Sequence, residues 1–241
     1  MSVDLPDVSV IIPAFNEEAY LPATLAALQA ASTRVRCEVI VVDNESTDRT
    51  AKIAERNGAV VLTESVHNIA RVRNTGAAAA GGDVLVFIDA DTIIPEELLA
   101  SIAQSMQDDR VVGGAVAVDY TPFERPWMRW YVRGWGFWSR FFNMKQGAAQ
   151  FCRRETFRQL GGYDERIYMG EDIHFYWRMA RHAKRGGARL RFIDRPRVIT
   201  SSRRFEKMGA WKTLVLTHPV VIWLTWKRRT MWRDWYDAPV R

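Results

Sequence analysis

The sequence predicts a single α/β domain with a mainly parallel central sheet, helices on both faces of that sheet and a helical C-terminal extension. In the first half, short and nearly continuous runs of β-branched residues alternate with segments of helical periodicity, which is typical of strands buried on both faces. Strands separated by helices of this length form βαβ units. The 241 residues, 48% hydrophobic and 26% charged, contain no repeat or low-complexity linker that would mark a domain boundary.

Four strands are predicted in the first half, and they cover Val8–Pro13, Glu38–Asp43, Ala59–Thr63 and Val84–Asp89. The helix after the first strand, Glu17–Ala31, carries leucines at helical spacing. The next helix opens at Ser46-Thr47-Asp48, a suitable N-cap, and closes at Asn57-Gly58, a suitable C-cap. A third helix covers Ile69–Ala80, and a fourth starts at Pro95, because proline suits the first helical turn.

The second half has a different composition. Phe123–Asn143 is crowded with Trp, Phe and Arg and is predicted to be a helix with wide aromatic cover. Glu171–Arg185 is strongly helical in pattern. The tail, Met208–Trp235, is predicted to be helical with a break at Pro219, which gives the C-terminal extension.

Composition excludes some classes of protein. Lys+Arg 34 against Asp+Glu 28 leaves a net charge of +6, which suits a polyanionic ligand or an anionic membrane surface. Cys37 and Cys152 are too far apart in sequence for a metal knuckle or a redox pair. Neither GxGxxG nor GxxxxGK[ST] occurs, which argues against a dinucleotide enzyme or a P-loop NTPase.

The expected location follows from the apolar segments. The first residues do not read as a signal peptide, and the longest apolar stretch, Leu214–Trp226, is interrupted and too short to span a bilayer. We expect a cytoplasmic protein, with a peripheral position at the inner membrane face as a further option. The aromatic-basic stretches Trp127–Phe142 and Trp223–Trp235 are either membrane-surface elements, an acceptor wall or simply core.

Acidic residues follow the predicted strands. The segments that end these strands are Ala14–Glu17, Asp43–Asp48 and Asp89–Thr92. Because ligands of parallel sheets bind at the carboxyl ends of the strands, these acids predict a divalent metal, ribose and base donors, or both. Asp89-Ala90-Asp91 offers the hard oxygen ligands that Mg²⁺ or Mn²⁺ prefers, although an acidic loop that caps the next helix is the alternative.

Four segments together resemble the family-two inverting glycosyltransferases with the GT-A fold. They are VSVIIPAFNEEAYL, VIVVDNESTDRT, ARVRNTGAAAAGGDVLVFIDADT and GGYDERIYMGEDIHFYWR, and the resemblance covers about Val8 to Arg178. It implies a single domain over residues 1–241, with a nucleotide-sugar-binding half at about 1–118, an acceptor half at about 119–206 and a tail at about 207–241. It also implies a nucleotide-diphosphate sugar as donor and Mn²⁺ or Mg²⁺ as cofactor.

The resemblance assigns the donor site residue by residue. The residues that would line the nucleotide base and ribose are Pro13, Ala14, Phe15, Asn16 and Glu17. The ring of Phe15 could stack on the base. Asp43 would read the base or ribose, and Asn44 stands where many relatives carry a second Asp. That departure weakens the case for uracil over guanine or thymine, although a UDP-sugar stays the first expectation, ahead of GDP- and TDP-sugars.

The reacting groups are assigned in the same way. Asp89 and Asp91 match the DxD motif around Ala90, so Asp91 would bind the metal, while Asp89 would face the ribose or sugar and serve as a further ligand. Arg73 resembles the arginine on the base or phosphate side, with a solvated helix charge as the alternative. Asp172 of the Glu-Asp pair corresponds to the catalytic base, although such a pair also favours a helix start.

Two adjacent arginines, Arg203 and Arg204, could fold over the diphosphate leaving group or form a solvated basic turn. The histidines show no metal-ligand spacing and are expected to be structural, with His218 a minor candidate for a third metal ligand. The acceptor is either a hydroxyl compound or a lipid phosphate. A basic nucleic-acid-binding protein is the rival from another class, but the acidic strand ends argue against it and no nucleic acid is expected as a partner.

Overall fold

The parallel strands form where the apolar runs predict them. The structure is a computed structural model that describes residues 8–121, 127, 128, 130, 134, 148–203, 218–228, 230 and 232. The parallel strands are β1 (Val8–Ala14), β2 (Cys37–Asp43), β3 (Val60–Thr63) and β4 (Val84–Ile88). β1 lies in parallel between β2 and β4, with Ile11 opposite both Ile40 and Phe87. Every residue of β4 is buried, which explains why its sequence is apolar without alternation.

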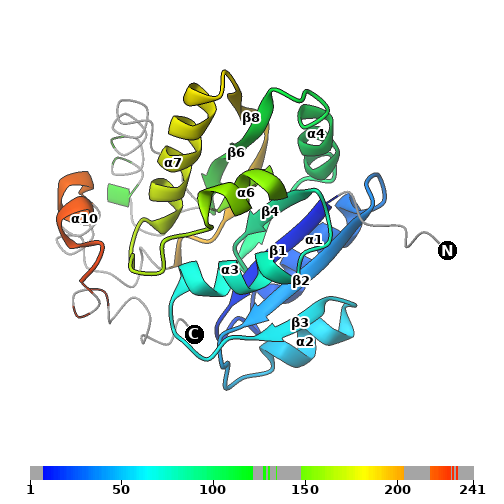
Figure 1. Cartoon of the computed structure of the whole chain (residues 1–241). Helices are drawn as coiled ribbons and strands as arrows, with labels where there is room; N and C mark the ends of the chain where they lie inside the picture. The colour runs from blue at the N-terminus through cyan, green and yellow to red at the C-terminus, as the bar shows by residue number, and fades with distance from the viewer. Residues whose placement is uncertain are drawn as a thin grey trace.

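The sheet continues into an antiparallel half that the sequence analysis did not predict. Its strands are β5 (Thr92–Ile93), β6 (Val111–Tyr120), β7 (Ala149–Arg153) and β8 (Arg189–Thr200). The strand order in the sheet is β3-β2-β1-β4-β7-β6-β8-β5 (Figure 1). β7 is antiparallel to β4 and β6, while β6 and β8 run parallel. The α/β class is therefore confirmed, in a mixed sheet whose parallel part carries the predicted site.

Three of the four helices in this half of the chain begin later than predicted, whereas the third begins at Ile69 as predicted. The four helices are α1 (Leu21–Ala31), α2 (Thr50–Arg56), α3 (Ile69–Ala79) and α4 (Leu98–Ser105). Residues 17–20 form a turn before α1, and Pro95 belongs to a turn before α4. Asp48 accepts a hydrogen bond from the backbone N–H of Thr50, so it holds the start of α2 from outside the helix. Gly58, at φ +77°, follows the C-cap of α2 as predicted.

The helices of the second half are α6 (Arg154–Leu160), α7 (Glu171–Arg185) and α10 (Pro219–Thr225). α7 has the predicted bounds. α10 begins at Pro219, where the break was predicted. Most of the predicted helix Phe123–Asn143 and much of the tail lie outside the described residues. None of the described helices is both long enough and apolar enough to cross a bilayer.

Helices pack against the sheet (Figure 1), and two hydrophobic cores lie between the helices and the strands. One core packs α1 and α4 against the sheet, through Leu25 and Ile102 among others. The other packs α3, α6 and α7 against it, with Phe87 and Phe175 fully buried. Gly76 lets α3 come this close, because a Cβ there would meet the side chain of Ile11 at 2.5 Å. Each buried aliphatic or aromatic side chain contributes about 1.5–3 kcal/mol.

Candidate active site

The predicted site residues come together at the carboxyl edge of the parallel strands. Pro13 and Ala14 end β1, Asp43 ends β2, and the Asp89–Asp91 turn follows β4. From other elements come Arg73 of α3, Asp172 of α7 and Arg203, three residues after β8. Arg204 lies outside the described residues.

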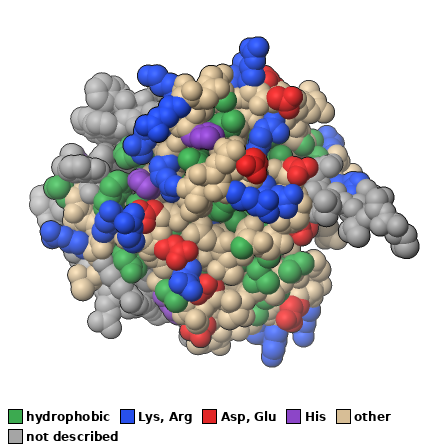
Figure 2. All heavy atoms as spheres, viewed as in Figure 1, with side chains coloured by type: hydrophobic (Ala, Val, Ile, Leu, Met, Phe, Trp, Pro, Cys, Tyr) green, Lys and Arg blue, Asp and Glu red, His purple; other side chains and the backbone are tan. Residues whose placement is uncertain are grey.

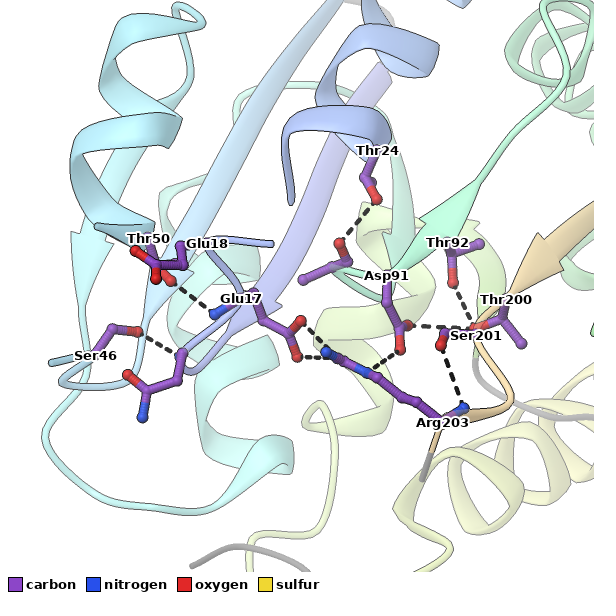
Figure 3. A network of polar contacts seen from close by, with 12 residues as sticks. Glu17, Glu18, Thr24, Ser46, Thr50, Asp91, Thr92, Thr200, Ser201 and Arg203 are labelled. Atoms are coloured by element: carbon purple, nitrogen blue, oxygen red, sulfur yellow. Dashed lines mark hydrogen bonds and ion pairs between the residues drawn. The ribbon is translucent and has the colours of Figure 1, made fainter. Parts of the chain in front are cut away.

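The loops after β1 and β2 lock together through hydrogen bonds (Figure 3). The backbone N–H of Asn16 donates to Ser46 Oγ at 2.9 Å, and that of Glu17 donates to Thr50 Oγ1 at 2.8 Å. In return, Asn16 Oδ1 accepts from the N–H of Thr47 at 2.8 Å. Asn16 has a φ of +54°, a left-handed conformation that Asn tolerates better than most residues. The predicted loop is thus held in a fixed shape by the segment that follows Asp43.

The two carboxylate oxygens of Asp43 differ in their contacts with the described residues. Its Oδ2 accepts from the backbone N–H of Ser46 at 3.2 Å, whereas Oδ1 is buried and has no hydrogen-bond partner among the described residues. Buried polar atoms are nearly always hydrogen-bonded, so an orphaned acceptor calls for an explanation. A ligand that donates an N–H or O–H would supply the missing hydrogen bond.

Asn44 is committed to the chain's own backbone. Its side-chain NH₂ group donates to the carbonyl oxygens of Glu64, at 2.5 Å, and Val66, at 3.1 Å. The amide therefore holds the loop after β3 against the end of β2. This gives the Asn at this position a structural role that the sequence did not reveal.

Phe15 pairs with His67, a residue that the sequence analysis placed among the structural histidines. Their ring centroids are 4.8 Å apart in an edge-to-face arrangement, and His67 Nε2 lies 3.9 Å from Glu45 Oε2. Both rings are half-buried. No local pattern marks His67, because only the packing of the loop after β3 brings it to Phe15.

Arg73 is the centre of a buried group that we call the Arg73 cluster: Arg73, Asp89 and Glu171. One terminal nitrogen of Arg73 donates to Asp89 Oδ1 at 2.8 Å, and the other donates to Glu171 Oε1 at 2.5 Å. Burial by itself lowers the pKa of Arg73, but the two carboxylates outweigh this effect and the pKa is raised. With both terminal nitrogens engaged and its Nε buried, Arg73 ties the start of α7 to the end of β4.

A second group, the Arg203 cluster, consists of Arg203, Glu17 and Asp91 (Figure 3). A terminal nitrogen of Arg203 donates to both carboxylate oxygens of Glu17 at 2.5 Å, and Nε donates to Asp91 Oδ2 at 3.2 Å. The guanidinium carbon lies 4.0 Å from the ring centroid of Tyr20. Thr200 Oγ1 donates to the other oxygen of Asp91 at 3.3 Å. Arg203 is thus brought to the acidic residues rather than left as a solvated basic turn.

The turn between the two aspartates is also fixed. Thr24 Oγ1, on α1, donates to the backbone carbonyl of Ala90 at 2.8 Å. The backbone N–H of Thr92 donates to the carbonyl of Asp89 at 3.1 Å. Asp89 and Asp91 therefore lie on a turn with little freedom, each directed to its own arginine.

The donor set suits a divalent cation that shares its shell with a ligand. Within the described residues, His, Cys, Asp and Glu side chains do not gather in a group of three that could hold a metal ion. Mg²⁺ is usually bound through one or two carboxylates plus phosphate oxygens, so Asp91 with Asp89 beside it fits that pattern. A guanidinium already bridges Asp91 and Glu17, which shows that a positive charge is stable there. His218 is exposed, directly before α10.

Asp172 and Glu171 have different surroundings. Glu171 is held in the Arg73 cluster, whereas Asp172 is half-buried and its Oδ1 accepts from the N–H of Ile173 at 2.7 Å. The carbonyl of Asp172 accepts from Gln150 Nε2 at 3.1 Å. Gln150, on β7, is a site residue that the sequence analysis did not single out, since its strand was not predicted.

A mixed sheet of this topology, with an Asp-Ala-Asp turn after β4, defines the class: this is a GT-A-type glycosyltransferase fold. The sequence model of glycosyl transferase family 2 matches residues 9–161, so the chain belongs to that family. Both predictions, of the family and of the fold, are confirmed.

Two of the curated relatives are longer than this chain. It is 27% identical over 252 residues to probable glycosyltransferase YdaM of Bacillus subtilis, covering 95% of this chain and 55% of that protein. It is 32% identical over 140 residues to undecaprenyl-phosphate 4-deoxy-4-formamido-L-arabinose transferase of Pseudomonas aeruginosa, covering 52% of this chain and 39% of that protein. The chain thus spans about half the length, or less, of these relatives.

Solved structures share the fold. The mannosyltransferase PcManGT of Pyrobaculum calidifontis, in complex with GDP-Man and Mn²⁺, has a TM-score of 0.67 and 23% identity, covering 92% of this chain and 64% of that one. S. aureus TarS 1-349, in complex with UDP-GlcNAc, has a TM-score of 0.64 and 20% identity, covering 85% and 62%.

Proposed function

We propose that this chain transfers a sugar from a nucleotide-diphosphate sugar to an acceptor by a metal-assisted, inverting single displacement. The observation that carries the proposal is the buried Oδ1 of Asp43, which has no hydrogen-bond partner in the part of the chain that the structure describes and lies at the same sheet edge as Asp89 and Asp91. A nucleoside supplies the N–H or O–H donor that this oxygen lacks. Phe15 supports the proposal, because its half-buried ring belongs to the loop beside Asp43.

For the donor base, we keep a UDP-sugar as the first expectation, ahead of GDP- and TDP-sugars. The two similar structures hold GDP-Man and UDP-GlcNAc, so both remain candidates. The NH₂ of Asn44 is occupied by backbone carbonyls, which leaves Asp43 as the acidic reader of the base or ribose. Thermal-shift screening of UDP-, GDP- and TDP-sugars with Mn²⁺ or Mg²⁺ would identify the donor, because a specific ligand stabilises the folded state.

For the cofactor, we propose that Asp91 holds a divalent cation, Mn²⁺ or Mg²⁺, with Asp89 beside it facing the ribose or sugar. When bound, such a cation neutralises the charge that develops on the leaving diphosphate. Arg203 adds a second positive charge on the same side, with Arg204 following it in the sequence.

For the chemistry, we assign Asp172 as the base. Its carboxylate accepts the proton of an acceptor hydroxyl, and the acceptor oxygen forms a bond to the anomeric carbon. The bond from that carbon to the diphosphate oxygen breaks on the opposite face, so the configuration inverts and the nucleoside diphosphate leaves. Glu171 is unsuited to this task, because Arg73 holds its carboxylate in a buried ion pair.

For the acceptor, two chemistries remain open, a hydroxyl compound and a lipid phosphate. A lipid phosphate is already anionic and has less need of a base. The relative named for undecaprenyl-phosphate supports this alternative. Exposed apolar side chains support contact with a membrane surface, since Trp130 is 72% and Leu224 59% exposed, although Trp232 is buried.

Charge on the surface bears on the rival function. On the face shown in Figure 2, basic and acidic side chains are interspersed. Nucleic-acid-binding proteins usually gather their basic residues in a patch or stripe. We therefore keep the transferase, at the membrane surface or away from it, as the proposed function.

The test is Asp172→Asn, which keeps the size of the side chain but removes its ability to accept a proton. We expect donor binding to be unchanged and transfer to a hydroxyl acceptor to fall by about 10²–10⁴-fold. Near-normal transfer would remove Asp172 from this role. Asp43→Ala is the companion variant, and it should weaken donor binding because its carboxylate contacts the nucleoside.

A further inference from the structure

The strongest unexplained feature is that the guanidinium of Arg203 covers the carboxylate of Asp91, the predicted metal ligand. Arg203 and Thr200 contact one oxygen of Asp91 each, and the same guanidinium contacts both oxygens of Glu17 (Figure 3). The side chain of Asp91 is only 11% exposed, whereas that of Asp89, paired with Arg73, is 33% exposed. A ligand can therefore approach Asp89 with its arginine in place, but at Asp91 the arginine lies over the carboxylate.

A divalent cation and this guanidinium compete for Asp91. Arg203 Nε takes up one lone pair of Oδ2 and Thr200 Oγ1 one of Oδ1, and with the side chain only 11% exposed the guanidinium covers the approach to the remaining lone pairs that a cation needs. The guanidinium and the cation would also repel each other at contact distance. Binding of the metal therefore requires Arg203 to move.

Arg203 is placed so that its side chain can move without unfolding the interior of a helix or strand. It is the first residue of a helical segment, three residues beyond the end of β8, and its backbone N–H donates to the neighbouring Ser201 Oγ at 3.3 Å. Its two partners, Glu17 and Asp91, belong to connecting segments. Arg73, by contrast, lies within α3.

We propose that Arg203 is the resident counter-ion of Asp91 and Glu17, and that the divalent cation and the diphosphate of the donor displace it together. This inference rests on the proposed function, because it takes Asp91 as the protein ligand of the metal. A diphosphate offers the guanidinium a stronger, bidentate partner than the carboxylates. Its arrival draws Arg203 away and frees Asp91, so that the metal and the nucleotide bind cooperatively.

The test measures binding of Mn²⁺ alone and of UDP and GDP alone, without turnover. Free Mn²⁺ is followed by electron paramagnetic resonance, and nucleotide binding by calorimetry. In Arg203→Gln, we expect Mn²⁺ to bind about 10-fold more tightly than in the wild type, because its competitor is gone. The nucleotide that binds the wild type should bind this variant more weakly, because the diphosphate loses its partner. Opposite signs for the two ligands are not expected from structural damage.

The matched control is Arg197→Gln. Arg197 lies on β8 and, like Arg203, pairs with two carboxylates, Asp119 at 3.0 Å and Asp194 at 2.9 Å. It is not part of the Arg203 cluster. This variant should bind Mn²⁺ and nucleotide as the wild type does. If Arg203→Gln fails to fold, Arg203→Lys serves instead, since its ammonium lacks the planar fork, and Mn²⁺ should still bind more tightly.

Equal or weaker binding of Mn²⁺ in both Arg203 variants would overturn the proposal. Asp91→Asn separates this failure from that of the proposed function. If Mn²⁺ binds the wild type and Asp91→Asn abolishes it, the metal site stands whatever Arg203 does. If Asp91→Asn binds Mn²⁺ as the wild type does, the metal is not held by Asp91, and the proposed role of that residue fails with the inference.

Discussion

The aspartates of Asp89-Ala90-Asp91 are held by different arginines, and the two arginines differ in their place on the backbone. Arg73 lies inside α3, and its partners stand directly after β4 and in the first turn of α7. Arg203 is only the first residue of a helical segment, and its partners, Asp91 directly before β5 and Glu17 between β1 and α1, belong to connecting segments. Both clusters place one guanidinium against two carboxylates, so their chemistry is matched while the backbone support of the arginine differs.

The difference separates a fixed ion pair from an exchangeable one. Arg73 cannot leave Asp89 without moving a helix that is packed against the sheet, so it sets the geometry of the turn and of α7. Arg203 stands at the start of a helical segment and can exchange its carboxylates for another anion by moving its side chain. Both clusters are buried, so removal of one partner leaves an uncompensated charge in either, and the cost is smaller where the chain can rearrange to bring that charge to water. The two clusters should therefore respond differently to matched substitutions.

The largest expected effect is that of Arg73→Met. This change leaves the Glu171 carboxylate buried without its cation, which should lower the free energy of unfolding by about 3–5 kcal/mol. Arg203→Met should cost less, about 1–3 kcal/mol, because Glu17 and Asp91 are buried but lie on connecting segments that can rearrange. Urea denaturation of both variants measures the difference. Equal losses would show that the two clusters are equally fixed.

The next effect compares the glutamates. Glu171→Gln removes a charge-assisted hydrogen bond to Arg73 and should lower the free energy of unfolding by about 2 kcal/mol. Glu17→Gln removes the corresponding charge from the Arg203 cluster and should cost less, about 1 kcal/mol, because its connecting segment can adjust to restore a hydrogen bond to Arg203. Chemical denaturation is again the measurement. A larger loss in Glu17→Gln would reverse the comparison.

The sequence predicted the parallel half of the fold because β1 to β4 are continuous apolar runs. It did not predict β8, where exposed charged residues such as Arg189 alternate irregularly with buried ones, nor β7, which includes the polar Gln150. These strands are fixed by their neighbours in the sheet, and a local pattern does not show those neighbours.

The same limit applies to the site. Acidic strand ends predicted the location of Asp43, Asp89 and Asp91, because parallel strands end at one edge. The partners of the two arginines were not predictable, since Arg73 and Glu171 are 98 residues apart and Arg203 and Glu17 are 186 residues apart. Short motifs give the residue types, while only the folded chain shows which pairs form.

A smaller effect is expected from the aromatic neighbour of Arg203. Tyr20→Leu removes the ring over which the guanidinium lies, at 4.0 Å, and should lower the free energy of unfolding by about 0.5–1 kcal/mol. It should also tighten the binding of Mn²⁺ slightly, because Arg203 is then held less firmly. No change in either quantity would mean that Glu17 and Asp91 alone hold Arg203.

The last comparison concerns how the stability of the folded chain depends on pH. Both arginines keep their charge at any pH at which the protein is folded, so neither of them causes such a dependence. His174, one turn into α7, does titrate. Its Nδ1 is buried and without a hydrogen-bond partner among the described residues, and its ring contacts Trp226 edge-to-face, with the centroids 5.3 Å apart. Burial lowers the pKa of His174, the charge of Arg178 lowers it further, and Asp164 acts in the opposite direction.

The smallest effect is therefore a pH dependence that belongs to His174 and to neither cluster. The folded-state pKa of His174 lies below its value in the unfolded chain, about 6.5, so the unfolded chain binds the proton first as the pH falls. Stability is complete above that pH and decreases below it, by at most about 1.4 kcal/mol for each unit by which the pKa is lowered. Urea denaturation at pH 7.5 and pH 5.5 should show this loss in the wild type and a smaller one in His174→Gln, while Arg203→Met should keep the wild-type slope. If His174→Gln loses as much stability on acidification as the wild type, the proton is taken up elsewhere, and the carboxylates of the two clusters become the next groups to examine.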